Sequence, residues 1–99
     1  MAYFVVINEQ GPAWNPACSM RDQEKWAEHA AFMNSLVDEG FVILGGPLKD
    51  GSTHKARLII KSVSEQAMRA RLAEDPWMRL GLLTTLTIEL WEVLLSKDE

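Results

Sequence analysis

The chain has 99 residues, of which 47% are hydrophobic and 24% charged, and its formal net charge at pH 7 is −4. This length and composition are typical of one small globular domain. The lysines and arginines are scattered, without the basic stripe or basic amphipathic segment that nucleic acids and anionic membranes require, so neither is an expected partner.

The compartment is predicted from the cysteine count and the first residues. Cys18 is the single cysteine, which excludes a disulfide within one chain. The apolar run at the start has no basic flank, and it is too short for a signal peptide or a membrane span. We therefore expect a cytoplasmic protein.

The first half of the chain reads as a strand, a loop and a helix. The aromatic and β-branched run Tyr3–Asn8 predicts a buried strand. The stretch Gly11–Ser19 contains two prolines and predicts a loop. We expect a helix to begin near Ser19, with Asp22 as a capping-box-like partner three residues on, and to end at Gly40.

One face of this helix is predicted to meet the sheet. Its residues follow the i, i+3, i+4, i+7 spacing of an amphipathic helix. They are Trp26, His29, Ala30, Met33, Leu36 and Val37. This spacing makes His29 a half-buried imidazole.

Three strands are expected in the second half of the chain. Phe41–Leu44 and Ala56–Lys61 should form a hairpin, with a turn at Asp50-Gly51-Ser52. Leu83–Leu94 reads as a long last strand, because apolar and polar residues alternate along it. The alternation becomes irregular at Leu90-Trp91, which indicates a bulge.

A second helix lies between the last two strands. Ser62 and Glu65 form a second capping box at its start. The helix should end at Asp75, because Pro76 disfavours helical geometry in the residue before it. Residues 76–81 are then expected to form a short connector.

The resulting order, βαββαβ, predicts an α+β fold of the ferredoxin-like type, with a four-stranded antiparallel sheet and two helices on one face. Three strands are nevertheless apolar on both faces. An uncovered apolar face is costly in water, so we expect a second copy to pack sheet to sheet. The alternative is a monomer in which the loop Gly11–Ser19 covers that face.

The chain resembles the YCII-related (DGPF-like) family. Three local features carry the resemblance: Trp26-Ala27-Glu28-His29-Ala30 on the first helix, Gly45-Gly46-Pro47-Leu48 after the second strand, and Asp75-Pro76-Trp77 after the second helix. Their order and spacing together cover nearly the whole chain.

This resemblance implies a dimeric α+β barrel and a small enzyme. A His on the first helix and an Asp after the second are suggested as a catalytic pair in the family, and they fall on His29 and Asp75. The family is similar in fold to muconolactone isomerases and to enzymes that dehalogenate chlorinated lactones. The stretch Gly11-Pro12-Ala13-Trp14 and the residue Trp26 depart from the shorter members, so the pocket lining is expected to differ.

His29 and Asp75 each have a functional and a structural interpretation. A half-buried imidazole can move a proton near neutral pH, or it can be a core histidine bonded to a backbone carbonyl. Asp75 at a helix C-terminus is disfavoured by the helix dipole, and protonated His29 would compensate it. Asp75 can also simply shape the turn before Pro76.

Further candidates would bind the substrate. Gly46 and Pro47 follow a strand end, where main-chain N–H groups could meet a ligand. Arg21 could hold an acidic group, or lie solvated at the surface. The tryptophans that could wall a pocket, or equally form core and interface, are Trp14, Trp26 and Trp77.

The leading hypothesis is an isomerase- or lyase-like enzyme that removes a proton next to the carbonyl of a small cyclic or carbonyl-bearing acid, without a cofactor. Two histidines and one cysteine at unrelated spacing make no zinc set, and no phosphate-binding glycine motif is present. The competing hypotheses are a non-catalytic metabolite-binding or assembly module and a haem protein that binds through His29.

Overall fold

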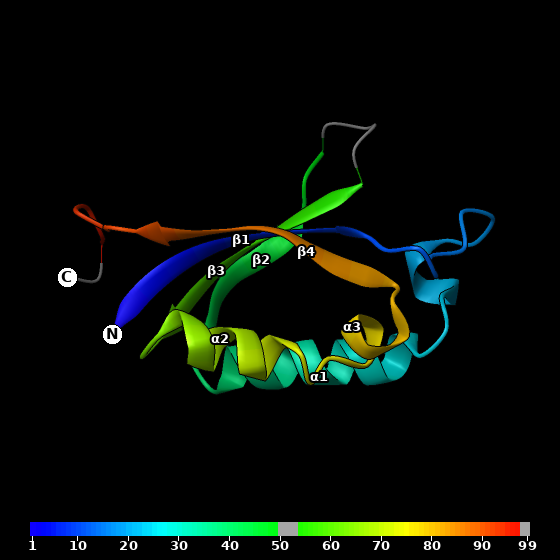
Figure 1. The fold of residues 1–99 in the computed structure, drawn as a ribbon, viewed down its shortest axis with the longest axis horizontal. Coiled ribbons are helices and arrows are strands. Elements are labelled where there is room, and N and C mark those ends of the chain that lie inside the picture. The colour runs from blue at the N-terminus through cyan, green and yellow to red at the C-terminus, as the bar shows by residue number, and fades with distance from the viewer. Residues whose placement is uncertain (50–53, 98–99) are drawn as a thin grey trace.

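The computed structural model describes residues 1–49 and 54–97. Over those residues, four strands form one antiparallel sheet in the order β2-β3-β1-β4, and the helices lie together on one of its faces (Figure 1). The elements are β1 (Ala2–Gln10), α1 (Trp26–Asp38), β2 (Val42–Pro47), β3 (Lys55–Ser62), α2 (Glu65–Leu72), α3 (Pro76–Leu80) and β4 (Leu83–Trp91). The ferredoxin-like α+β fold predicted from the sequence is therefore confirmed.

The central strand β1 shows how the two faces of the sheet differ. Its residues Phe4, Val6 and Asn8 are buried under the helices, whereas the residues between them face the other way. The core between sheet and helices consists of Phe4, Val6, Leu36, Val42, Leu58, Ile60, Met68 and Leu72.

The first helix begins later than the sequence predicts. Ser19 and Asp22 flank a short 3-10 helix, Met20–Asp22, where the Ser19 hydroxyl donates to the Asp22 carboxylate at 3.0 Å. The helix α1 itself starts at Trp26, after Lys25 with its left-handed φ of 62°. The prediction of a start near Ser19 was wrong because the two polar residues satisfy each other rather than the backbone.

The second helix also has a different cap. Ser62 is the last residue of β3, and Ser64 is the N-cap residue of α2, with its hydroxyl accepting a hydrogen bond from the Ala67 N–H at 3.0 Å. The predicted Ser62–Glu65 capping box is therefore wrong by two residues. Residues 76–80, predicted as connector, form the short helix α3.

The described sheet contains two register irregularities, and neither lies at the predicted place; one of them is in β2, between Val42 and Leu44 opposite β3. Between β1 and β4 the pairing shifts from Ile7↔Thr87 to Asn8↔Thr85, while the ladder at Leu90 and Trp91 is regular. The last strand also ends at Trp91 rather than at Leu94. The predicted turn at residues 50–52 lies outside the described residues.

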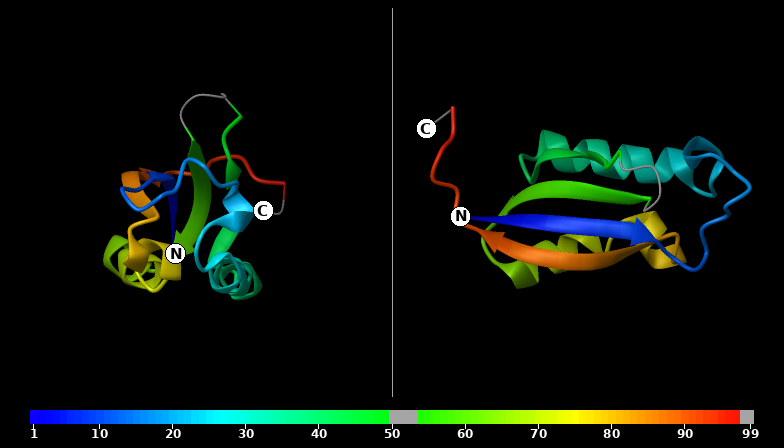
Figure 2. Two further views of the ribbon diagram at one scale, coloured as in Figure 1. Left: turned by 90° about the vertical axis from the view of Figure 1, so that its right-hand side faces the viewer. Right: turned by 90° about the horizontal axis from the view of Figure 1, so that it is seen from above.

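The loop Gly11–Ser19 packs at one end of the sheet. The Gly11 N–H donates to the Leu82 carbonyl at 2.8 Å, and the Gln23 side chain donates to the Asn15 carbonyl at 2.7 Å. Figures 1 and 2 show this loop beyond the end of β1, beside α3 and the start of α1. It therefore does not cover the face opposite the helices, which the monomer alternative required.

In the described ranges, the helices are all too short to cross a bilayer.

Candidate active site

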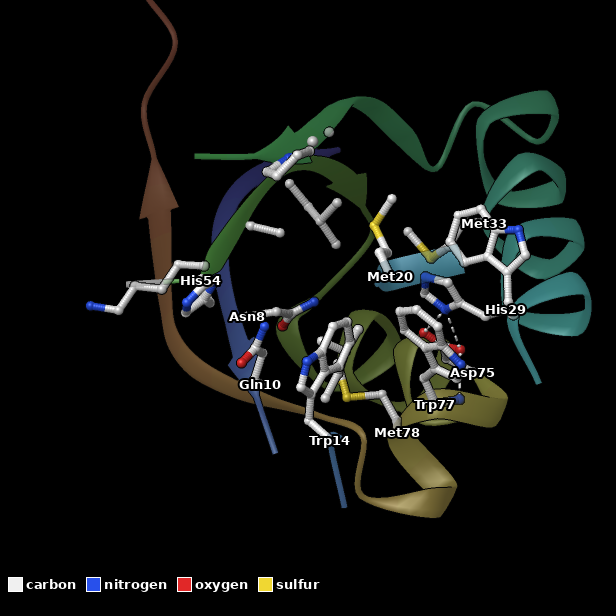
Figure 3. A pocket seen from close by; sticks show the side chains of 18 of the residues that line it. Asn8, Gln10, Trp14, Met20, His29, Met33, His54, Asp75, Trp77 and Met78 are labelled. Carbon is white, nitrogen blue, oxygen red and sulfur yellow. Dashed lines mark hydrogen bonds and ion pairs between the residues drawn. The ribbon is translucent and has the colours of Figure 1, made fainter. Parts of the chain in front are cut away.

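A cavity of about 900 Å³ lies between the sheet and the helices. Helix α1 contributes His29 and Met33, α3 contributes Trp77, the loop contributes Trp14, and β1 contributes Asn8 (Figure 3). Its volume matches that of a pocket for a small molecule. The predicted helix face bearing His29 thus meets a hollow rather than a closed core.

His29 is held by Asp75 from a segment 46 residues away. The Nδ1 atom of His29 lies 2.8 Å and 2.9 Å from the two carboxylate oxygens of Asp75 (Figure 3). An ionised carboxylate only accepts, so in the neutral form of the ring the proton lies on Nδ1 and Nε2 keeps its lone pair. Within residues 1–49 and 54–97, Nε2 has no hydrogen-bond partner. The imidazole therefore offers a bare Nε2 on the cavity wall.

Asp75 also caps α3. Its Oδ1 atom accepts a hydrogen bond from the Trp77 N–H at 2.9 Å, and only 2% of Asp75 is exposed. The predicted position of this carboxylate at a helix C-terminus is wrong, because α2 already ends at Leu72. At the N-terminus of α3, the backbone N–H groups stabilise the negative charge.

Trp77 fixes the plane of the imidazole. Its ring lies parallel to that of His29, with centroids 3.9 Å apart and planes 5° apart. Its Nε1–H donates to the carbonyl of Glu24 at 2.7 Å, which ties α3 to the start of α1. Trp14 and Trp26 pack on Trp77 at centroid distances of 5.4 Å and 5.7 Å. The three tryptophans predicted as candidates therefore form one cluster centred on Trp77, and the rings of Trp26 and Trp77 contact His29.

The other predicted binding residues differ in whether they line the cavity. Gly46 and Pro47 line the cavity, but as part of β2, which continues past the predicted end at Leu44. Arg21 is exposed, outside the cavity lining, with its guanidinium 5.8 Å from the Trp26 ring centroid.

Several lining residues were not predicted from the sequence. Asn8 and Gln10 form a polar strip on β1, and Lys49, His54 and Lys55 lie at the β2–β3 end of the cavity. Asn8 could have been predicted, because it is a polar residue at a core-facing position of a strand. The three basic residues could not be assigned to the cavity without the sheet pairing.

Metal ligands do not gather anywhere in the described part of the chain: no group of three His, Cys, Asp or Glu side chains is close enough to hold an ion. The imidazole of His29 is already engaged by Asp75 on one nitrogen.

No family model and no curated protein sequence matches the chain. Among solved structures, it is similar to the 5-chloro-2-hydroxyhydroquinone dehydrochlorinase of Burkholderia phenoliruptrix AC1100 in complex with 2,5-dihydroxybenzoquinone. The TM-score is 0.66 at 21% sequence identity, over 91% of this chain and 93% of that chain. A likeness at this level of identity shows that the two proteins share the α+β fold.

Proposed function

We propose that this protein is a small enzyme in which His29 acts as general base and acid toward a cyclic, carbonyl-bearing acid. The observation that carries the proposal is the bare Nε2 of His29 on the cavity wall, with Nδ1 fixed by Asp75 and the ring stacked on Trp77. A base needs a fixed orientation and a partner for its cationic form, and these two neighbours supply both.

The proposed reaction begins with proton removal. Nε2 takes a proton from the carbon next to a carbonyl group, and the electron pair of the broken C–H bond forms an enolate. Asp75 stabilises the imidazolium that results. The imidazolium then returns the proton to a different carbon, which is isomerisation. In elimination, the enolate instead expels a leaving group, which departs with the electrons of its bond to carbon, and the imidazolium gives its proton to that group or to water.

Two features of the cavity lining support a substrate that is both ring-shaped and acidic. Trp14 and Trp26, which are half-buried and pack on the buried Trp77, offer aromatic surfaces in the cavity lining. Besides the thiol of Cys18, the ionisable groups of the described lining are two lysines, two histidines and one carboxylate, Asp75, which is already paired. This balance favours an acidic ligand. The structural neighbour, a dehydrochlorinase in complex with 2,5-dihydroxybenzoquinone, is consistent with a ring of this kind.

The proposal can be tested before the substrate is known. A panel of lactones, enol acids and halogenated ring acids is incubated with the protein in D2O, and NMR follows the loss of the proton next to the carbonyl. We expect catalysed exchange for a ring acid in the wild-type protein and its loss in His29→Gln. Asn34→Gln is the matched control, because Asn34 also lines the cavity but is exposed and uncharged. Exchange that persists in His29→Gln would rule out the base.

A metabolite-binding module is the second candidate, and the tryptophan cluster favours it. In that case ring acids bind equally well to the wild-type protein and to a double variant His29→Gln/Asp75→Asn, without proton exchange in either. Haem binding through His29 predicts a Soret band after reconstitution, which the acid/base proposal does not.

We also retain the sheet-to-sheet dimer and the resemblance to YCII-related proteins as proposals. The face opposite the helices carries Val5, Leu44 and Ile59, which share one cross-strand row. Leu94 and Leu95 beyond β4 are 80% and 93% exposed. Burial of these side chains against a second copy would remove apolar surface from water. Light scattering after gel filtration would give twice the chain mass for a dimer.

A further inference from the structure

We infer that the side-chain amide of Asn8 is a ligand-binding group, which donates a hydrogen bond to a carbonyl or enolate oxygen of the molecule on which His29 acts. This inference rests on the proposed function and extends it. It assigns two polar contacts to one ligand: a proton-transfer contact to His29 and an acceptor oxygen at Asn8.

Asn8 is a polar residue in a buried position. Asn8 is 4% exposed and follows Phe4 and Val6 on the helix-facing side of β1. A polar group at such a position is costly unless its hydrogen bonds are made. Among the described residues no side-chain nitrogen or oxygen is both fully buried and unpartnered, so an amide nitrogen of Asn8 without a protein partner must be accessible from the cavity.

The side-chain amide of Asn8 has an incomplete set of hydrogen bonds among the described residues. The Oδ1 atom of Asn8 accepts a hydrogen bond from the Thr85 hydroxyl at 3.3 Å. Its Nδ2 group, with two donor hydrogens, has no partner among residues 1–49 and 54–97. Figure 3 shows this nitrogen directed into the cavity, toward the side where Met20 and His29 lie. The donor is therefore free for a ligand.

Asn8 lies at the bulge between β1 and β4. The register between β1 and β4 shifts between Ile7 and Asn8, which brings Asn8 opposite Thr85. Bulges are frequent at sheet edges, such as the edge strand β4, and beside active sites, where they redirect a side chain. Here the shift supplies the hydroxyl that holds the oxygen of the amide and leaves its nitrogen on the cavity side.

The chemistry of the ligand follows from these two groups. His29 must meet a carbon or oxygen that gives up a proton, and Asn8 offers only donors to the cavity. An acceptor oxygen at Asn8 that gains negative charge as the proton leaves would bind more tightly in the transition state. A ring with a carbonyl or enolate oxygen remote from the reacting hydrogen has this arrangement.

The experiment uses 2,5-dihydroxybenzoquinone as probe and measures its dissociation constant by quenching of tryptophan fluorescence. Asn8→Asp is nearly isosteric and retains the acceptor for Thr85, but it replaces the donor with a negative charge. We expect binding about 10- to 100-fold weaker than in the wild-type protein, and about 10-fold weaker in Asn8→Leu. Asn34→Leu is the matched control, because Asn34 also lines the cavity but is exposed.

A second measurement uses the wild-type protein and so does not depend on whether a variant folds. In the wild-type protein, the side-chain amide resonance of Asn8 should shift on addition of the probe, and that of Asn34 should not. Unchanged affinity in folded Asn8→Asp, tighter binding there, or an Asn8 resonance that stays in place while the His29 ring signals move would overturn this inference and leave the proposed function intact. A wild-type protein that binds no probe and exchanges no proton in the panel would instead overturn the proposed function.

Discussion

The imidazole of His29 lies flat on the indole of Trp77, with ring centroids 3.9 Å apart and planes 5° apart. The backbone N–H of the same Trp77 donates to Asp75, whose carboxylate holds Nδ1 of His29. Three consecutive residues, Asp75-Pro76-Trp77, therefore fix both the plane and the tautomer of the candidate base. The short helix α3 is best understood as the support of His29.

The side chain of Trp77 should contribute strongly to the stability of the fold. Trp77→Ala removes a side chain that is 2% exposed and should lower the free energy of unfolding by about 3–5 kcal/mol. Trp77→Phe keeps a ring beside His29 and loses the hydrogen bond to Glu24, so we expect a loss of about 1–2 kcal/mol. Urea denaturation measures both. Equal stabilities for the two variants would show that the ring packing does not matter.

Asp75→Asn should separate catalysis from folding. Asparagine is as good an N-cap residue as aspartate, so α3 should survive with a stability change of about 0.5 kcal/mol or less. The amide no longer stabilises an imidazolium and can donate to Nδ1, which reverses the tautomer. We expect proton exchange to slow by about 10²–10⁴-fold. An exchange rate within twofold of wild type would exclude Asp75 from the pair.

The pH dependence of proton exchange should report on His29. A general base must be unprotonated, so the rate should fall as the pH is lowered and the imidazole gains its proton. In His29→Gln this acid limb should be absent from any residual rate, while His54→Gln should retain it. The test is a pH–rate profile of deuterium exchange for all three proteins, and an identical acid limb in His29→Gln would contradict the assignment.

Two neighbouring glycines of β2 should respond differently to alanine. A Cβ atom at Gly45 would lie 2.6 Å from Cδ2 of Leu58, a buried core residue, whereas a Cβ atom at Gly46 would meet nothing within 4 Å. Gly45→Ala should therefore lower the free energy of unfolding by about 1–3 kcal/mol. Gly46→Ala should change it by about 0.5 kcal/mol or less. Thermal unfolding of the two variants would reveal equal values if this packing argument were wrong.

The fold could be predicted because its signals are local. Alternation and runs of apolar residues located all the strands of the described sheet, and the apolar face of α1 located its core side. The ends of elements were less predictable. Ser19 and Ser62 both look like cap residues, but one bonds to Asp22 and the other ends β3, and only tertiary packing decides this.

The site was predictable only in part. His29 stood out on an apolar helix face, and Trp77 was predicted as a possible pocket wall. Their stacking, and the contact of His29 with Asp75 across 46 residues of sequence, depend on how α3 docks on α1. The orientation of the Asn8 amide depends on the bulge between β1 and β4, where the pairing passes over Leu86. The alternation of apolar and polar residues along β4 did not indicate a bulge at that position.

The protonation of the two ring nitrogens of His29 tests the central claim most directly. Long-range ¹H–¹⁵N correlation spectra of the imidazole, recorded above the pH at which the ring is charged, distinguish the two neutral tautomers. We expect a protonated Nδ1 and a bare Nε2, and we expect the Nε2 signal to move when a ring acid is added. A spectrum with the proton on Nε2 and a bare Nδ1 would contradict the account, because the nitrogen facing the cavity could then accept nothing.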